Sequence, residues 1–326
     1  MGTKISVIVA TTNPQPYVIQ WALDSLAHQT LPKAAFEIVI VDNNSRPPLE
    51  EGPLTRYGGL PLRIVREPRQ GVTFARCTGI LAATSDLAVF LDDDNYVEPE
   101  YLSRALLIAE SQPEIGAFGG ISRILSEGRI PAWKRDLLPY LGVRDYGPDV
   151  ITSKEDKWGP WEPIGAGMVF RRDIGLEFVN VIKTNSTAQL LGRRGTSFVC
   201  GEDSLLARMA YRLGYSCSYQ PSLKLTHMIK STRLTPKHLA RTIEGVARAY
   251  VIYETVLGRP APPRSLYAIS RELLVRCRQR TRSRGVKAGL IEWSWDVGYF
   301  RQARLLQKTL PAQRNGSEDL HRYPQL

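Results

Sequence analysis

Short apolar runs alternate with helix-like segments through the first part of the chain. Four runs rich in apolar and β-branched residues predict strands: Ile5–Ala10, Glu37–Val41, Leu62–Arg66 and Leu87–Leu91. Between the first two, one helical face carries Val18, Ile19, Ala22, Leu23 and Leu26. Helices are also predicted at Phe74–Ala83 and at Pro99–Ala109, with Pro99 in the first turn. This alternation predicts an α/β fold, a mostly parallel sheet flanked by helices, whose ligands bind at the carboxyl ends of the strands.

The second half of the chain changes character twice. Ile130–Pro163 is rich in Trp, Pro, Gly and Tyr and has no regular period, which is typical of a binding loop. Glu162–Phe170 then predicts a strand, and Ser204–Leu213 predicts a helix ended by Gly214. From Pro236 the pattern is helical, with a break at Gly258–Pro263. We therefore expect one α/β domain over residues 1–235 and a helical C-terminal region over residues 236–326.

Charge is distributed unevenly between these two regions. The chain carries 43 Lys and Arg against 32 Asp and Glu, a net charge of +11, and residues 236–326 account for 17 of the basic and 7 of the acidic residues. Arginines between Arg276 and Arg284 are followed by the aromatic residues Trp293, Trp295, Tyr299 and Phe300. Basic and aromatic residues on one helix are typical of binding to an anionic membrane surface, here through residues 264–308. A helical appendage with a solvated basic face is the alternative, and nucleic-acid binding is less favoured because no reader motif accompanies the charge.

The sequence also bears on the compartment. No apolar stretch approaches the ~18 residues of a membrane-spanning helix, and the N-terminus does not resemble a secretory signal. The four cysteines show no paired spacing, which favours free thiols in a reducing compartment. The prediction is a cytoplasmic protein, with peripheral attachment to the inner face of the membrane as the variant that the basic region suggests.

Acidic residues follow two of the predicted strands and open one of the predicted helices. Asp92, Asp93 and Asp94 come directly after Leu87–Leu91, and three adjacent carboxylates repel one another unless a cation or basic groups neutralise them. Magnesium or manganese held by one or two carboxylates plus substrate phosphates would do so, and a solvated acidic turn is an equal alternative. Asp42 follows the second strand, where an Asx turn would also explain it.

A second acidic pair lies at the start of a predicted helix. Glu202 and Asp203 could serve there as a general base or only stabilise the helix N-terminus. His227 follows a strand-like run and, like most lone histidines, could merely be packed. Lys230 and Arg233, close behind it, would suit a diphosphate.

Taken in order, these segments resemble family 2 glycosyltransferases of the GT-A fold, over roughly residues 4–235. Ser6–Asn13 resembles the opening strand and nucleotide-binding turn, which includes Thr11 and Asn13, and Val41–Ser45 resembles the V-D-[DN]-x-S segment. Gly71–Gly79 resembles the G-x-x-x-A-R-N-x-G helix, although Cys77 replaces its usual Asn, and Asp92–Asp94 resembles the D-x-D motif. Glu202-Asp203 resembles the family's E-D pair, and His227 and Arg233 resemble its late His and Arg.

The resemblance implies roles for individual residues. The nucleotide and its diphosphate would be bound by Thr11, Asn13, Asp42, Arg76, Asp92, Asp93, His227 and Arg233. A divalent cation, Mn²⁺ or Mg²⁺, would be bound by Asp94 with Asp92 and His227. Asp203 would act as the general base, with Glu202 as the next candidate. Apart from the resemblance, Trp158 and Trp161 could stack on sugar rings of the acceptor, and burial beneath a long loop would explain them equally well.

The implied activity is an inverting transfer of a sugar from a nucleotide sugar, UDP being the expected nucleotide, to a hydroxyl of a glycan, a lipid-linked acceptor or another glycoconjugate. Two alternatives stay open at this point. A nucleotidyltransferase would use the same nucleotide and metal but release pyrophosphate. A nucleotide-sugar binding protein without turnover would use the same cleft.

Overall fold

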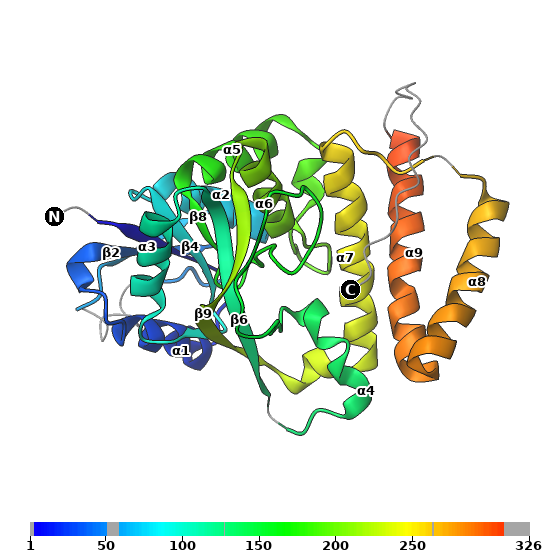
Figure 1. Ribbon diagram of the computed structural model, residues 1–326, viewed down its shortest axis with the longest axis horizontal. Coiled ribbons are helices and arrows are strands. Elements are labelled where there is room, and N and C mark those ends of the chain that lie inside the picture. The colour runs from blue at the N-terminus through cyan, green and yellow to red at the C-terminus, as the bar shows by residue number, and fades with distance from the viewer. Residues whose placement is uncertain (1–2, 51–58, 127, 263, 310–326) are drawn as a thin grey trace.

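The computed structural model describes residues 3–50, 59–126, 128–262 and 264–309. Its helices lie on both sides of a central sheet, and three long C-terminal helices stand side by side at one end (Figure 1). The strands are β1 (Ile5–Thr11), β2 (Phe36–Asp42), β3 (Leu62–Arg66), β4 (Leu87–Asp92), β5 (Asn95–Val97), β6 (Ile115–Ser126), β7 (Ile151–Ser153), β8 (Val169–Arg171) and β9 (Ser216–Ile229). The α-helices are α1 (Pro16–Ala27), α2 (Val72–Ala82), α3 (Tyr101–Ser111), α4 (Ala132–Arg135), α5 (Arg172–Thr184), α6 (Glu202–Arg212), α7 (Pro236–Val256), α8 (Leu266–Arg284) and α9 (Val286–Thr309).

The sheet has the order β3-β2-β1-β4-β8-β6-β9-β5, with β7 paired to β9. Strands β3, β2, β1 and β4 are parallel, and β6 and β9 are parallel to each other. Strand β8 joins these two groups and is antiparallel to both β4 and β6. The predicted α/β fold with a mostly parallel sheet is confirmed, and strands β5, β6 and β7 are additions that the sequence did not predict.

The register of the parallel strands brings their polar carboxyl ends together. Thr11 at the end of β1 is paired with Asp42 of β2, and Ala10 is paired with Asp92 of β4. The strands themselves are almost fully buried, because apolar side chains point into the helices on both faces. Polar groups can therefore reach solvent only where the strands end, and the site lies at this edge.

Two sequence predictions of local structure are wrong. Glu162–Phe170 does not form a strand: only its end belongs to β8, because Pro163, Gly165 and the left-handed Gly167 (φ 75°) keep the rest in an irregular loop. Helix α3 begins at Tyr101, so Pro99 precedes the helix instead of lying in its first turn. The predicted free cysteines are confirmed, since all four belong to the described residues and none forms a disulfide.

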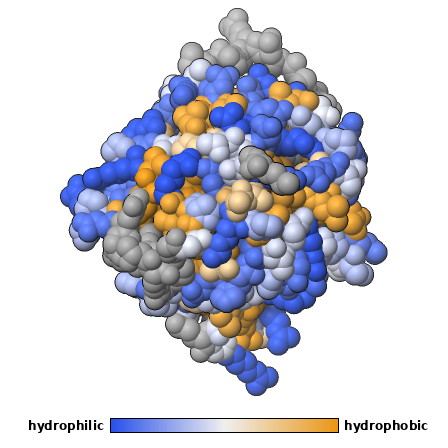
Figure 2. Space-filling model, turned by 90° about the vertical axis from the view of Figure 1, so that its left-hand side faces the viewer, coloured by the Kyte–Doolittle hydropathy of each residue, from blue (hydrophilic) through white to orange (hydrophobic). Residues whose placement is uncertain are grey.

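The C-terminal helices pack as a layer against the α/β part. Helix α7 contacts α6 and α9, and α8 contacts α9, so α9 lies between α7 and α8 (Figure 1). The break predicted at Gly258–Pro263 separates α7 from α8. On the opposite side of the molecule, where α3 and β2 lie, the surface is mainly hydrophilic with scattered hydrophobic patches (Figure 2).

Candidate active site

The three acidic residues after β4 have three different partners. Asp92 Oδ1 lies 3.1 Å from Arg76 Nη2. Asp93 accepts a hydrogen bond from the Thr11 hydroxyl at the end of β1. Asp94 Oδ2 lies 2.9 Å from Arg233 Nη1. The acidic run is therefore no solvated turn, because each carboxylate is held by a group from a different segment of the chain.

These partners separate the protonation behaviour of neighbouring acids. Burial raises the pKa of Asp93 to about 6, and the charges of Asp94 and Asp92 add to this shift while the Thr11 hydrogen bond opposes it. Burial would also raise the pKa of Asp94, but His227 and Arg233 outweigh it, so that this pKa lies below its ordinary value. Of these two acids, Asp94 is the one whose negative charge the site stabilises.

His227 comes to Asp94 through the sheet. It lies within β9, opposite Asn95 of the antiparallel β5, and the N–H of Met228 donates to the carbonyl oxygen of Asp94 over 2.9 Å. This pairing holds His227 Nε2 at 3.3 Å from Asp94 Oδ1. From the sequence we expect His227 to follow a strand. It lies within β9 instead, and the strand positions its imidazole.

Arg76 is a buried cation at the centre of the site. Its guanidinium contacts Asp92 and also Glu202, whose Oε1 lies 2.9 Å from Arg76 Nη1, and it packs over the ring of Phe90. A β-carbon on Gly165 would lie 2.5 Å from this guanidinium, so a larger residue there would force the Arg76 side chain to shift. Arg76 therefore ties the end of β4 to the start of α6, and its charge is taken up by protein carboxylates.

Glu202 and Asp203 occupy the first turn of α6 but face different surroundings. Burial raises the pKa of Glu202, Arg76 opposes the shift, and the charge of Asp203 adds to it, with a raised pKa as the outcome. Asp203 accepts hydrogen bonds from the N–H of Gly165 over 2.7 Å and from the N–H of Ser204 over 2.9 Å. Both bonds fix the orientation of Asp203 and leave lone pairs on its oxygens for a further donor.

A cavity of about 370 Å³ collects most of these groups. Its lining includes the acidic run Asp92–Asp94, both acids of α6, Arg76, His227 and Arg233. The C-terminal helices contribute Val246, Ala249, Tyr250 and Tyr253 from α7 and Trp295 from α9. Gly201 (φ 84°) permits this arrangement, because a β-carbon there would come within 2.8 Å of the Ala249 side chain. The predicted helical region thus forms one wall of the site.

A second cavity of about 300 Å³ adjoins the first. It is lined by the turn after β1, from Thr12 to Gln15, and by Met228 and Lys230 after His227. Both cavities share Asp93, Asp94 and Arg233, so these three residues stand at the boundary between them. Asn13, one of the predicted nucleotide-binding residues, lines the second cavity in a left-handed conformation (φ 46°).

Three residues singled out from the sequence lie outside both cavities. Asp42 is 1% exposed, and its carboxylate accepts the N–H groups of Ser45 and Leu49, so it binds the following backbone but not over the two-residue span of an Asx turn. Thr11 is buried and reaches the site only through Asp93. Trp161 donates to the hydroxyl of Tyr211, whereas Trp158 does line the larger cavity.

Several lining residues gave no signal in the sequence. Arg193 lines the larger cavity and is close enough to Asp94 to lower its pKa. Tyr140, Tyr250, Tyr253 and Trp295 add aromatic side chains to the same wall. In the sequence these aromatics sit at helical spacing or in an irregular loop, where they cannot be distinguished from ordinary core residues.

Comparison with known proteins agrees with this geometry. The family model described as "Glycosyl transferase family 2" matches residues 6–175, which is more than half of the chain. The chain belongs to glycosyl transferase family 2. The matched segment contains the strand ends, Arg76 and the acidic run, whereas α6 to α9 lie beyond it.

Individual relatives carry glycosyltransferase names. A putative glycosyltransferase of Bacillus subtilis, EpsH, is 30% identical over 116 residues, which are 34% of this chain and 32% of that protein. The chain thus spans about a third of the length of several curated relatives that it matches. A glucosyl-dolichyl phosphate glucuronosyltransferase of Haloferax volcanii is 23% identical over 231 residues, 69% of each protein.

A solved structure shares the fold of this chain. The mannosyltransferase PcManGT of Pyrobaculum calidifontis, in complex with GDP-Man and Mn²⁺, aligns with a TM-score of 0.53 over 93% of this chain and 88% of that one, at 17% identity. At this identity the likeness concerns the fold, which is the predicted GT-A type with C-terminal helices.

The donor atoms around Asp94 fit part of a metal site. Asp94 and His227 approach each other closely, but Asp92 is paired with Arg76. No group of three or more His, Cys, Asp or Glu side chains suited to a metal occurs among the described residues. Two protein ligands are too few for a closed site, but they fit a divalent cation whose remaining ligands are phosphate oxygens and water.

Proposed function

We propose that this family 2 enzyme transfers a sugar from a nucleotide-sugar donor to an acceptor hydroxyl with inversion at the anomeric carbon. The observation that carries the proposal is the placement of Asp203 and of the Asp94, His227 and Arg233 cluster on one cavity. A sugar transfer requires these two functions together: a base for the acceptor and positive charge for the leaving diphosphate. UDP is the first candidate nucleotide, and the Pyrobaculum mannosyltransferase, solved with GDP-Man, makes GDP the second.

The two cavities suggest how the donor lies. The nucleoside would occupy the second cavity, beside the turn from Thr12 to Gln15, and the sugar would extend into the larger one. The diphosphate would then lie at the boundary, near Arg233 and Arg193. When bound by Asp94 and His227, a Mn²⁺ or Mg²⁺ ion would neutralise charge on the diphosphate.

Asp203 would act on the acceptor. As the acceptor oxygen bonds to C1 of the sugar, the bond from C1 to the diphosphate oxygen breaks, and the hydroxyl proton passes to the Asp203 carboxylate. The hydrogen bond from Gly165 would hold this carboxylate in place, and Glu202, which is buried and ion-paired with Arg76, is the second candidate for the base. Arg233 and Arg193 would stabilise the negative charge that develops on the departing diphosphate.

The aromatic wall indicates the acceptor side. Trp158, Tyr250, Tyr253 and Trp295 line the cavity together with Asp203. Flat apolar surfaces of this kind suit the face of a sugar ring that presents C–H groups, or the apolar part of a lipid-linked acceptor. A glycan or lipid-linked glycan is accordingly the proposed acceptor class.

A donor screen tests the proposal. The purified protein is incubated with common nucleotide sugars, including UDP- and GDP-linked ones, with and without Mn²⁺, and the nucleotide products are identified. Release of a nucleoside diphosphate that depends on the metal supports the proposal. Pyrophosphate release from a nucleoside triphosphate would favour a nucleotidyltransferase, and tight donor binding without any release would favour a binding protein.

A further inference from the structure

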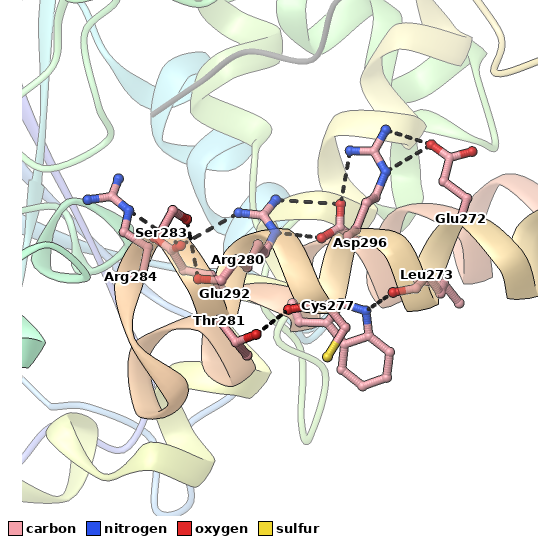
Figure 3. A network of polar contacts seen from close by, with 11 residues as sticks. Glu272, Leu273, Cys277, Arg280, Thr281, Ser283, Arg284, Glu292 and Asp296 are labelled. Atoms are coloured by element: carbon pink, nitrogen blue, oxygen red, sulfur yellow. Dashed lines mark hydrogen bonds and ion pairs between the residues drawn. The ribbon is translucent and has the colours of Figure 1, made fainter.

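The arginines of α8 fall on two faces with different surroundings. Arg276, Arg280 and Arg284 contact Glu272 of α8 and Glu292 and Asp296 of α9. Figure 3 shows Arg280 and Arg284 beside these acids. Asp296 is 1% exposed and Glu292 is 5% exposed, so these acids are buried between the two helices. Asp136 also contacts Arg284, and Arg264 also contacts Glu272, so four arginines meet four acids and the inner face of α8 is neutral.

The outer face of α8 has no such compensation. Arg271, Arg278 and Arg282 are exposed, and none of them forms an ion pair with any residue that the structure describes. At 3.6 residues per turn they share an arc of roughly 100° with Tyr267, Leu274 and Val275. These three apolar residues are 80%, 65% and 47% exposed. We call these six residues the α8 outer face.

We propose that the α8 outer face binds the headgroup region of an anionic lipid bilayer. Its arginines can contact lipid phosphates while Tyr267, Leu274 and Val275 enter the boundary between headgroups and acyl chains. A nucleic acid would satisfy the arginines but would leave the apolar side chains in water. Among the described residues no helix is both long and apolar enough to cross a bilayer, so α8 would lie along the surface.

The structure removes the α9 aromatic residues from the predicted membrane contact. The aromatic residues expected to meet the membrane together with the arginines lie on α9, and Trp295, Tyr299 and Phe300 are buried there. Their rings pack against one another and against Tyr250 of α7. The apolar contribution to membrane binding therefore comes from α8 itself.

This placement has a consequence that rests on the proposed function. Helix α8 packs on α9, and α9 contributes Trp295 to the larger cavity. Packed helices lie about 8–10 Å apart, so a bilayer bound to α8 would be one or two helix diameters from the acceptor wall. An acceptor anchored in that bilayer would meet the cavity without leaving the membrane.

Vesicle flotation tests the proposal without any need for turnover. The purified full-length protein is mixed with phosphatidylcholine vesicles, with or without phosphatidylglycerol, at low and at high salt. We expect binding to the anionic vesicles that weakens at high salt. The triple variant Arg271→Gln, Arg278→Gln, Arg282→Gln should bind about 100-fold more weakly, since each basic residue near such a surface contributes about a factor of five. The variant Tyr267→Ser, Leu274→Ser should lose the binding that persists at high salt.

A matched control removes the same charge elsewhere. Arg129, Lys154 and Lys183 are exposed and form no ion pair with the described residues, and their replacement by Gln should leave vesicle binding within about twofold of wild type. Circular dichroism checks that every variant is folded. The proposal is overturned if wild type does not bind anionic vesicles at low salt, whether or not it binds RNA or duplex DNA in a separate assay. It is equally overturned if the control variant loses as much binding as the α8 variant. Release of the nucleoside diphosphate, measured with a soluble acceptor and without vesicles, tests the proposed function separately.

Discussion

The larger cavity and the junction between α8 and α9 both bring acids and arginines together, but only the junction is balanced. At the junction, Asp296 has arginine partners on both oxygens, and Glu292 contacts the guanidinium groups of Arg280 and Arg284 (Figure 3). In the larger cavity the acids still outnumber the basic side chains, and the lining contains Asp92, Asp93, Asp94, Glu162, Glu202 and Asp203 against Arg76, Arg144, Arg193, His227 and Arg233.

The electrostatics follow this difference. In the cavity, burial and neighbouring acids raise the pKa of Asp93 to about 6 and also raise the pKa of Glu202. Glu202 Oε2 is buried and has no hydrogen-bond partner among the described residues. An incompletely paired acidic cluster is relieved by protonation of one of its acids, by a cation or by a proton-donating ligand, and such clusters are frequent at functional sites. A balanced cluster holds helices together, and an unbalanced one is the better candidate for chemistry.

The largest expected effect concerns Asp203. Replacing it by Asn keeps the size of the side chain but removes the proposed base, so turnover should fall about 10²–10⁴-fold. Donor affinity, measured by calorimetry, should change little, because Asp203 faces the acceptor. Steady-state release of the nucleoside diphosphate measures the rate. Near-normal turnover would contradict the assignment and transfer the role to Glu202.

The matched change at the junction should act on stability instead. Asp296→Asn leaves Arg276 and Arg280 without their shared carboxylate. Removing one partner of a fully buried pair costs about 3–5 kcal/mol, and the partly exposed arginines reduce the expected loss to about 2 kcal/mol. Urea unfolding measures this loss, while turnover per folded molecule should stay within a fewfold of wild type. A large loss of turnover with unchanged stability would contradict the distinction between the two clusters.

Much of the fold could be predicted from the sequence, because the parallel strands are short apolar runs separated by clear helical patterns. Arg76 shows the limit for the site. Its position in a helix motif suggested a nucleotide contact, but only the folded chain reveals that Asp92 and Glu202 take up its charge. Ion pairing between distant segments depends on tertiary distances, and one sequence carries no record of them.

Asp42 and the loop before β8 show two other limits. A carboxylate at a strand end can bind a ligand or the following backbone, and Asp42 binds the N–H groups of Ser45 and Leu49. The alternating apolar residues of Glu162–Phe170 imitate a strand, although glycine and proline direct the backbone into the loop that contacts Asp203. Tyr250 and Trp295 were missed because a helix residue that lines a cavity has the same spacing as one that fills a core.

The chemistry proposed for the larger cavity requires its acidic cluster to bind a cation together with a diphosphate. The most direct test of this requirement is a calorimetric titration, with and without Mn²⁺, using the nucleoside diphosphate that the donor screen identifies. For wild type, the metal should strengthen binding by at least about tenfold, since Asp94 and His227 can bind it only together with phosphate oxygens. Asp94→Ala should lose this gain while its metal-free binding is retained, because Arg233 remains to contact the diphosphate. Equal affinity with and without Mn²⁺ in wild type, or an unchanged metal effect in Asp94→Ala, would contradict the account.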